Sequence, residues 1–128
     1  MQTFTKAERL CSKVIIDDVF AKGKTISVPS FKLFWLRAAG QQHVPMQIVI
    51  TVPKRNFKKA VDRNKLKRRI REAYRKSKAA AYAQISNEGY YLMLVYTGKS
   101  IVEYKEIEEK IIKLLQRFIS ESKSNALL

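Results

Sequence analysis

Apolar residues in the first part of the chain recur at intervals of three and four, the spacing of one helix face. We expect a helix from about Thr5 to Ala21, with Thr5 and Glu8 as a capping box and Gly23 as a left-handed terminator. Its apolar stripe is wider than one packing seam needs and comprises Leu10, Cys11, Val14, Ile15, Ile16, Val19 and Phe20. Either this helix is covered on two sides, or one edge of it lines a groove.

The apolar period then shortens to two, which predicts strands at residues 24–28, 31–39 and 46–52. In the second strand the alternation directs Phe31, Leu33 and Trp35 to one face and Lys32, Phe34 and Leu36 to the other. Both faces of that strand are thus partly apolar. The links between the three strands are short, which favours an antiparallel meander.

A helical period returns at residues 60–83, with an inward stripe of Val61, Leu66, Ile70, Ala73 and Tyr74. A fourth strand follows at 90–96, and Ser100 with Glu103 offers a capping box for a last helix. The inward residues of that helix are Tyr104, Ile107, Ile111, Leu114, Leu115 and Phe118. We expect one α+β domain over residues 1–128, in the order α-β-β-β-α-β-α, with an ordered core at about 4–119 and a frayed tail at 120–128.

The 128 residues suit a single domain, and the apolar share of 46% is ordinary for a chain that buries a core. The 26 Lys and Arg against 11 Asp and Glu leave a formal charge of +15, which opposes compaction and indicates a polyanionic partner. No apolar run approaches the roughly 20 residues that cross a bilayer, so we expect no membrane partner. We expect Cys11, the only cysteine, to be a buried packing thiol in a reducing, cytoplasmic compartment.

The positive charge is concentrated in residues 54–78, where 13 Lys and Arg against Asp62 and Glu72 carry +11 of the total +15. If residues 60–78 are helical, one continuous outer face consists of Asn64, Lys67, Arg68, Arg71 and Arg75. Like charges at these spacings repel by a few tenths of a kcal/mol per pair. Because nothing nearby offers compensating acids, we prefer a nucleic-acid ligand to a merely solvated basic face. A nuclear-localisation signal would not explain the amphipathic phase.

The stretch AVDRNKLKRRIREAYR, Ala60–Arg75, resembles the signature of the bacterial ribonuclease P protein family. Similar elements of that family fall at Arg9–Leu10, Val19–Gly23 and Phe31–Phe34, and the resemblance covers essentially residues 4–119. It implies a small α/β sandwich with a left-handed crossover from the third strand through the basic helix to the fourth. It also implies a protein that binds a catalytic RNA and contacts the 5′ leader of precursor tRNA, with no obligate protein partner. The chemistry would belong to the RNA, with Mg²⁺ held mainly by the RNA.

Carried onto this chain, the resemblance and the charge pattern imply the RNA-binding residues Arg63, Asn64, Lys65, Lys67, Arg68, Arg71, Arg75, Lys54 and Arg55. The leader would lie in a cleft between the first helix and the sheet, at Phe20, Phe34 and Ile16. The alternative for both phenylalanines is ordinary core packing. Lys65 stands where the family usually has an arginine, and residues 53–60 lack a usual glycine, which leaves the path of that loop open.

We expect no catalytic residue and no metal site in the protein itself. His43 is the only histidine and lies in a predicted turn, so it and Cys11 cannot form a zinc site. Neighbouring carboxylates at Asp17–Asp18 and Glu108–Glu109 point apart on a helix. The alternative from another class is a structural ribosomal protein, although such proteins often carry their charge in extended tails. A duplex DNA regulator would need a dimer surface, for which the pattern gives no indication.

Overall fold

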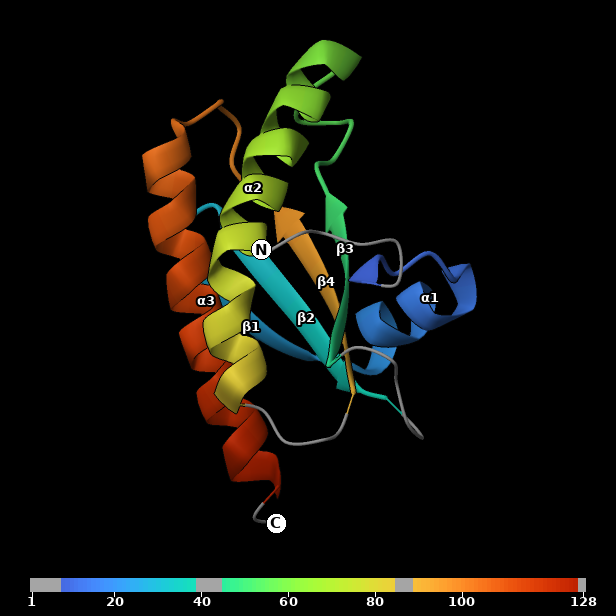
Figure 1. The fold of residues 1–128 in the computed structure, drawn as a ribbon. Helices are drawn as coiled ribbons and strands as arrows, with labels where there is room; N and C mark the ends of the chain where they lie inside the picture. The colour runs from blue at the N-terminus through green and yellow to red at the C-terminus, as the bar shows by residue number, and fades with distance from the viewer. Residues whose placement is uncertain (1–7, 39–44, 85–88, 127–128) are drawn as a thin grey trace.

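The computed structural model describes residues 8–38, 45–84 and 89–126, and His43 lies outside them. The chain forms its elements in the predicted order (Figure 1). They are α1 Lys13–Lys22, β1 Lys24–Val28, β2 Phe31–Arg37, β3 Met46–Thr51, α2 Ala60–Gln84, β4 Tyr90–Tyr96 and α3 Tyr104–Ala126. None of the helices in the described part of the chain is long and apolar enough to cross a membrane.

The four strands form one sheet in the order β1-β2-β4-β3. Strand β1 pairs with β2 and β2 with β4 in antiparallel fashion, whereas β3 pairs with β4 in parallel. The predicted three-strand meander is therefore correct for β1 and β2 and wrong for β3. Strand β4 has apolar side chains on both faces, as strands buried within a sheet do, and it takes the central position between β2 and β3.

The connection from β3 through α2 to β4 is left-handed. With both strands pointing upward and α2 in front of the sheet, β4 lies to the left of β3 (Figure 1). Right-handed crossovers are found in about 98% of such units. The handedness implied by the family resemblance is thus present in this chain.

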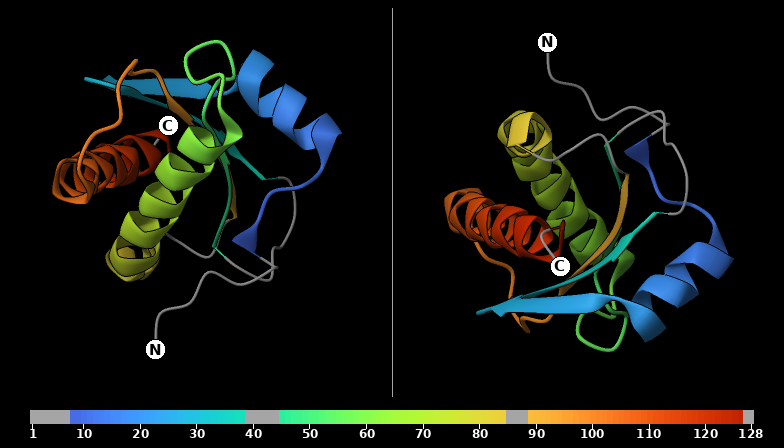
Figure 2. Two further views of the ribbon diagram at one scale, coloured as in Figure 1. Left: turned by 90° about the horizontal axis from the view of Figure 1, so that it is seen from above. Right: turned by 90° about the horizontal axis from the view of Figure 1, so that it is seen from below.

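Helices α2 and α3 cover one face of the sheet, and α1 lies on the other (Figure 2). The core lies under α2 and α3, where alternate residues of all four strands are buried together with the inner faces of both helices. Strand residues of this core include Ile26, Leu33, Trp35, Ile48, Leu92 and Leu94, and the helical ones include Leu66, Ile70, Tyr74, Ile107, Ile111 and Phe118. Helix α1 buries only Val19, so most of its surface is accessible.

Helix α1 begins later than the sequence predicts. Its N-cap is Ser12, whose hydroxyl accepts a hydrogen bond from the backbone N–H of Ile15 at 3.4 Å. The prediction that Glu8 belongs to a capping box is wrong, because Glu8 lies before the N-cap. Thr5, the other residue of the predicted box, lies outside the described residues. The chain before α1 runs beside β3 instead: Arg9 forms a parallel bridge with Ile48, and the Leu10 N–H donates to the Ile48 carbonyl at 3.0 Å.

Three expectations for single residues are also wrong. Gly23 has a φ of −70°, not a left-handed one; it is needed because a Cβ there would lie 2.3 Å from the Val19 carbonyl oxygen. Cys11 is exposed because it precedes the helix. Val61 is 75% exposed because the first turn of α2 projects beyond the ends of β3 and β4, where it has no layer to pack against (Figure 1).

Helix α3 differs from its prediction at both ends. It begins at Tyr104, and the Ile107 N–H donates to the Glu103 carbonyl at 3.2 Å, so Ser100 is not the cap. The Ser100 carbonyl instead accepts from the Tyr96 hydroxyl at 2.6 Å. The helix then continues to Ala126 with Ser122 buried, so the expectation of a frayed tail from residue 120 is wrong through 126.

Candidate nucleic-acid interface

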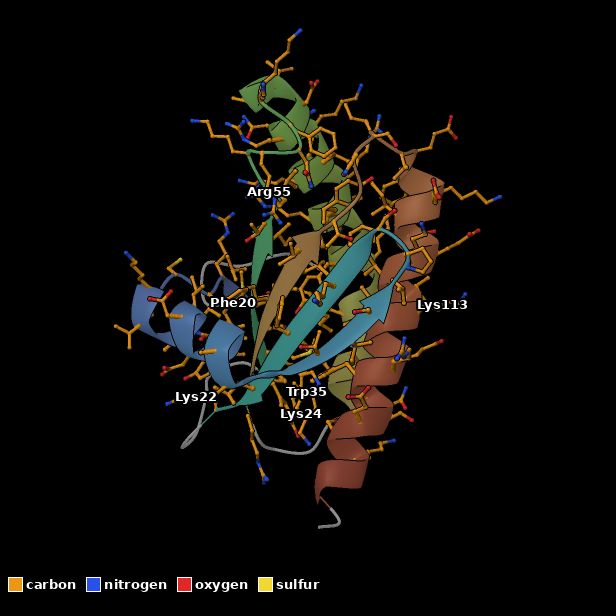
Figure 3. The ribbon with its side chains drawn as sticks, turned by 180° about the vertical axis from the view of Figure 1, so that it is seen from behind. Phe20, Lys22, Lys24, Trp35, Arg55 and Lys113 are labelled. Atoms are coloured by element: carbon orange, nitrogen blue, oxygen red, sulfur yellow. The ribbon has the colours of Figure 1, made fainter. Side chains whose placement is uncertain are left out.

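Phe20 of α1 and Phe34 of β2 meet on the face of the sheet that α1 covers (Figure 2). Figure 3 shows Phe20 where α1 meets the sheet. Their ring centroids lie 5.3 Å apart, with the ring planes at 45°. Phe20 is 62% exposed and Phe34 is half-buried, so neither ring belongs to the sealed core. Ile16 is half-buried one turn before Phe20, on the same side of the helix. We call Ile16, Phe20, Lys32 and Phe34 the aromatic patch.

Lys32 was not among the predicted site residues, although it belongs to this patch. Its ammonium nitrogen lies 5.7 Å from the centroid of the Phe34 ring, and its side chain is exposed. The signal was present in the sequence, because residues two apart on a strand share a face. The patch therefore combines accessible aromatic surface with a cation at its edge.

Helix α2 presents a second feature, which we call the basic face: Asn64, Lys65, Lys67, Arg68 and Arg71. All but Lys67 are exposed, and Lys67 is half-buried. The opposite side of the helix buries Leu66, Ile70, Ala73 and Tyr74 as predicted. The amphipathic phase deduced from the sequence is thus confirmed, with the exception of Val61.

Arg63 and Arg75, predicted as RNA-binding, have protein partners. The Arg63 guanidinium donates to the carbonyl oxygens of Phe57 at 2.7 Å and Lys58 at 3.0 Å, which ties the preceding loop to α2. Arg75 donates to both carboxylate oxygens of Glu72, and this hydrogen bonding holds the pKa of Glu72 below its usual value.

Two further basic residues of α2 are structural. Arg69 donates to the Val102 carbonyl at 2.6 Å, which links α2 to the start of α3. Lys78 is buried and donates to both Glu8 oxygens, at 2.7 and 2.6 Å. The expectation that nothing nearby compensates the charge is therefore wrong in part: Glu72, already counted against the charge, bonds to Arg75, and the uncounted Glu8 comes from 70 residues away to pair with Lys78.

Lys54 and Arg55 lie in the turn that follows β3 and are exposed. The Asn56 and Phe57 N–H groups both donate to the Pro53 carbonyl, at 3.2 and 3.3 Å, and the buried Phe57 ring anchors the loop in the core. Figure 3 shows Arg55 at the tip of β3. This path of the loop, which the sequence left open, sets both cations at the end of the strand that borders the basic helix.

In the described part of the chain, no three His, Cys, Asp or Glu side chains gather closely enough to hold a metal ion. A hollow of about 380 Å³ lies between α2 and α3 and is lined mainly by alanine and aliphatic residues, together with Lys76 and polar neighbours. No carboxylate or histidine lines it. The candidate features among the described residues are therefore the exposed cations of α2 and the exposed aromatic contact, and both suit binding of a polyanion.

Comparison with known proteins gives one consistent result. The Ribonuclease P family pattern matches residues 4–119. The chain is similar to the ribonuclease P protein component of Porphyromonas gingivalis, 26% identical over 96% of this chain and 91% of that protein. It is 30% identical to the component from Thermotoga petrophila, over 91% of this chain and 96% of that protein.

Solved structures of two such proteins share the fold. The RNase P protein from Thermotoga maritima superposes with a TM-score of 0.68 at 26% identity, covering 86% of this chain and 96% of that one. The RNase P protein of Staphylococcus aureus also gives 0.68, at 20% identity, over 87% of this chain and 94% of that one. The second likeness concerns the fold alone.

Proposed function

The chain belongs to the ribonuclease P protein family, and from that premise we propose that it binds the catalytic RNA through the basic face and the 5′ leader of precursor tRNA at the aromatic patch. As a subunit of an endoribonuclease, it would promote removal of the leader to give the mature 5′ end. The family match favours this role over that of a structural ribosomal protein. It leaves the assignment of individual residues as our proposal.

The observation that carries the proposal is the exposed contact between Phe20 and Phe34. Most large aromatic side chains of this protein are buried, since Phe31, Trp35, Tyr74, Tyr96 and Phe118 all belong to the core. An aromatic pair left in water forgoes the stabilisation that burial would give, about 25 cal/mol per Å² of apolar surface. A single-stranded leader compensates for this, because bases stack on such rings with little sequence preference.

The basic face supports the second contact. Arg68 and Arg71 offer planar donor sets that fit phosphate oxygens in a two-pronged manner, and Asn64 can bond a base edge or a ribose hydroxyl. Its side chains project away from the core side of α2. An extended surface of the catalytic RNA can therefore approach the helix without disturbing the core.

We further propose that hydrolysis is carried by the RNA, with Mg²⁺ held mainly by RNA ligands. Hard divalent cations require several convergent oxygen ligands. The described residues include no cluster of three potential metal-binding side chains. The contribution of the protein would then be affinity and positioning.

The test compares binding of precursor tRNA and mature tRNA to holoenzyme reconstituted with a bacterial ribonuclease P RNA. We expect Phe20→Ala or Phe34→Ala to weaken precursor binding by about 5- to 150-fold, the equivalent of about 1–3 kcal/mol of lost stacking, and to leave mature tRNA binding unchanged. Val14→Ala is the matched control, because Val14 is 72% exposed on another side of α1. Equal weakening of both ligands would contradict the leader assignment.

The assignment of the basic face has its own test. The double variant Arg68→Ala and Arg71→Ala should impair assembly with the catalytic RNA. In a separate assay, wild-type protein should raise 5′ cleavage of precursor tRNA at low Mg²⁺. Unimpaired assembly by the double variant would contradict the assignment. If about four side chains neutralise leader phosphates, log affinity for the leader should fall with log salt at a slope near −3.

A further inference from the structure

A small depression lies at the outer edge of β3, between the basic face and the aromatic patch. Its volume is about 170 Å³, and it is lined by Arg9, Leu10 and Cys11 of the segment before α1, by residues 48–50 of β3, and by Arg71 of α2. Two arginines thus share the lining of one hollow with apolar residues. Arg9 and Arg71 are both exposed.

The depression connects two surfaces that otherwise lie on different sides of the sheet. Arg71 belongs to the basic face. Val49 of the lining pairs in register with Met93 of β4, and Met93 pairs with Phe34 of β2. Val49 and Phe34 are therefore two strand spacings apart, about 10 Å. A polynucleotide strand that leaves the aromatic patch meets this edge before it reaches α2.

Arg9 is held in place by its two neighbours. On one side the carboxylate of Glu8 accepts hydrogen bonds from Lys78 at 2.6 and 2.7 Å and from the Tyr82 hydroxyl at 2.5 Å. Glu8 is only 3% exposed and Lys78 only 6%. On the other side Leu10 is buried and its N–H donates to the Ile48 carbonyl at 3.0 Å. The backbone at Arg9 is thus fixed from both directions, which sets its side chain at the rim.

We propose that this depression, the edge site, binds the phosphodiester backbone of the precursor strand where it passes between the aromatic patch and the basic face. Arg9 is its phosphate contact, Arg71 marks its border with the basic face, and Glu8 and Lys78 are positioning residues that hold Arg9 at the rim. The apolar lining suits the sugar or the face of a base, and the Arg9 guanidinium suits phosphate oxygens. This inference rests on the proposed function, because it assumes that the leader occupies the aromatic patch.

Cys11 provides a direct readout, because it is the only cysteine of the chain, it is exposed, and it lines the edge site. The experiment measures the rate at which iodoacetamide alkylates Cys11 in holoenzyme alone, with mature tRNA, and with precursor tRNA that carries a leader. We expect the precursor to slow alkylation at least about tenfold relative to mature tRNA. Equal rates with the two ligands would overturn the edge site.

Substitution at Arg9 gives the second measurement. Arg9→Ala should weaken binding of precursor tRNA by about 5- to 10-fold, Arg9→Lys should restore most of that loss, and mature tRNA binding should not change. The control is Lys113→Ala, which also removes one positive charge but lies on α3, far from α1 (Figure 3). An Arg9→Ala protein that behaves like Lys113→Ala would refute the assignment of Arg9.

Failure of this inference can be told apart from failure of the proposed function. If wild-type holoenzyme does not prefer precursor over mature tRNA, or if Phe20→Ala leaves that preference intact, the leader assignment itself is wrong. If the preference exists and depends on Phe20, but Cys11 alkylation is the same with both ligands, only the edge site is wrong. Wild-type holoenzyme serves the preference and alkylation measurements, and Phe20→Ala holoenzyme completes the comparison.

Discussion

Lys78 and Lys67 lie on the same basic helix, yet the structure assigns them different roles, and this difference can be measured. Lys78 is buried with its ammonium on the Glu8 carboxylate, whereas Lys67 is half-buried on the basic face. Replacing each by methionine removes one charge and keeps a chain of similar length. We expect Lys78→Met to change stability and Lys67→Met to change the salt dependence of RNA binding.

The size of the destabilisation expected for Lys78→Met follows from the burial of Lys78 and Glu8. Removing one partner of a buried ion pair typically costs about 3–5 kcal/mol, because the remaining charge is left uncompensated. Tyr82 still donates to Glu8 in the Lys78→Met protein, so we expect the lower end, about 3 kcal/mol. The total free energy of unfolding of a domain of this kind is about 5–15 kcal/mol. With a urea dependence of about 1–3 kcal/mol per molar, the unfolding midpoint should fall by about 1–3 M.

The assay is urea unfolding followed by circular dichroism, with Glu8→Gln/Lys78→Met as a partner variant. Removing both charges should recover most of the loss, since pairs of buried charges are often replaceable at little net cost. Lys67→Met should unfold within about 0.5 kcal/mol of wild type, as surface changes usually do. Its binding to the catalytic RNA should lose about 0.7–0.9 of a unit in the slope of log affinity against log salt. If Lys78→Met unfolds like Lys67→Met, the buried pair does not contribute as we argue.

Three further outcomes follow from single contacts. Arg63→Ala should destabilise the protein by about 1–3 kcal/mol in urea unfolding, because the Phe57 and Lys58 carbonyls lose their donor, whereas Arg63→Lys should recover part of that loss. Gly23→Ala should cost about 1–3 kcal/mol in thermal unfolding, because its Cβ would press on the backbone carbonyls of Val19 and Trp35; an unchanged midpoint would contradict this. Burial raises the pKa of Tyr104 to about 12 and that of Tyr82 further. Their neutral forms therefore favour the folded state, and stability is retained below about pH 10 and lost as the pH rises toward 12, which absorbance of tyrosinate at successive pH values would check.

Patterning along the sequence was sufficient to predict the type and order of all seven elements. Helix α2 and strand β4 are the clearest cases, because a long amphipathic period and a short run that is apolar on both faces leave little choice. The core side of α2 followed from the same period, at Leu66, Ile70 and Tyr74. Local periodicity carries this information because it depends on residues within one element.

Pairing between distant segments could not be predicted in the same way. The local pattern of β3 does not show whether this strand pairs with β2 or with β4. Parallel pairing with β4 requires a long crossover connection, which α2 provides. The start of α1 was misplaced for a similar reason. Glu8 has the spacing of a capping residue, but its partner Lys78 is 70 residues away, and this contact outweighs the local signal.

In the candidate site, too, features set within one element were predictable and contacts between distant residues were not. Phe20 and Phe34 were predicted for the site and come into contact, because α1 packs against the face of β2 that carries Phe34. The sequence could not tell which cations of α2 face solvent and which hold the protein together. Arg63, Arg69 and Lys78 were counted as positive charge for a partner, and each bonds to the protein. Charge is visible in a sequence, whereas the distribution of hydrogen-bond acceptors around it is not.

The segment before α1 serves the edge of the sheet in a manner that joins stability and binding. An uncovered edge strand presents unpaired N–H and C=O groups, and proteins commonly cover such an edge. Here residues 8–10 lie along β3, and they are held by one bridge and one buried ion pair. Since the same segment carries Arg9, we expect a change that releases Glu8 from Lys78 both to loosen this cover of β3 and to displace Arg9. Apolar side chains can often replace a buried ion pair at little cost in stability. We infer that the pair between Glu8 and Lys78 is nevertheless useful here, because it fixes one position of this segment rather than several.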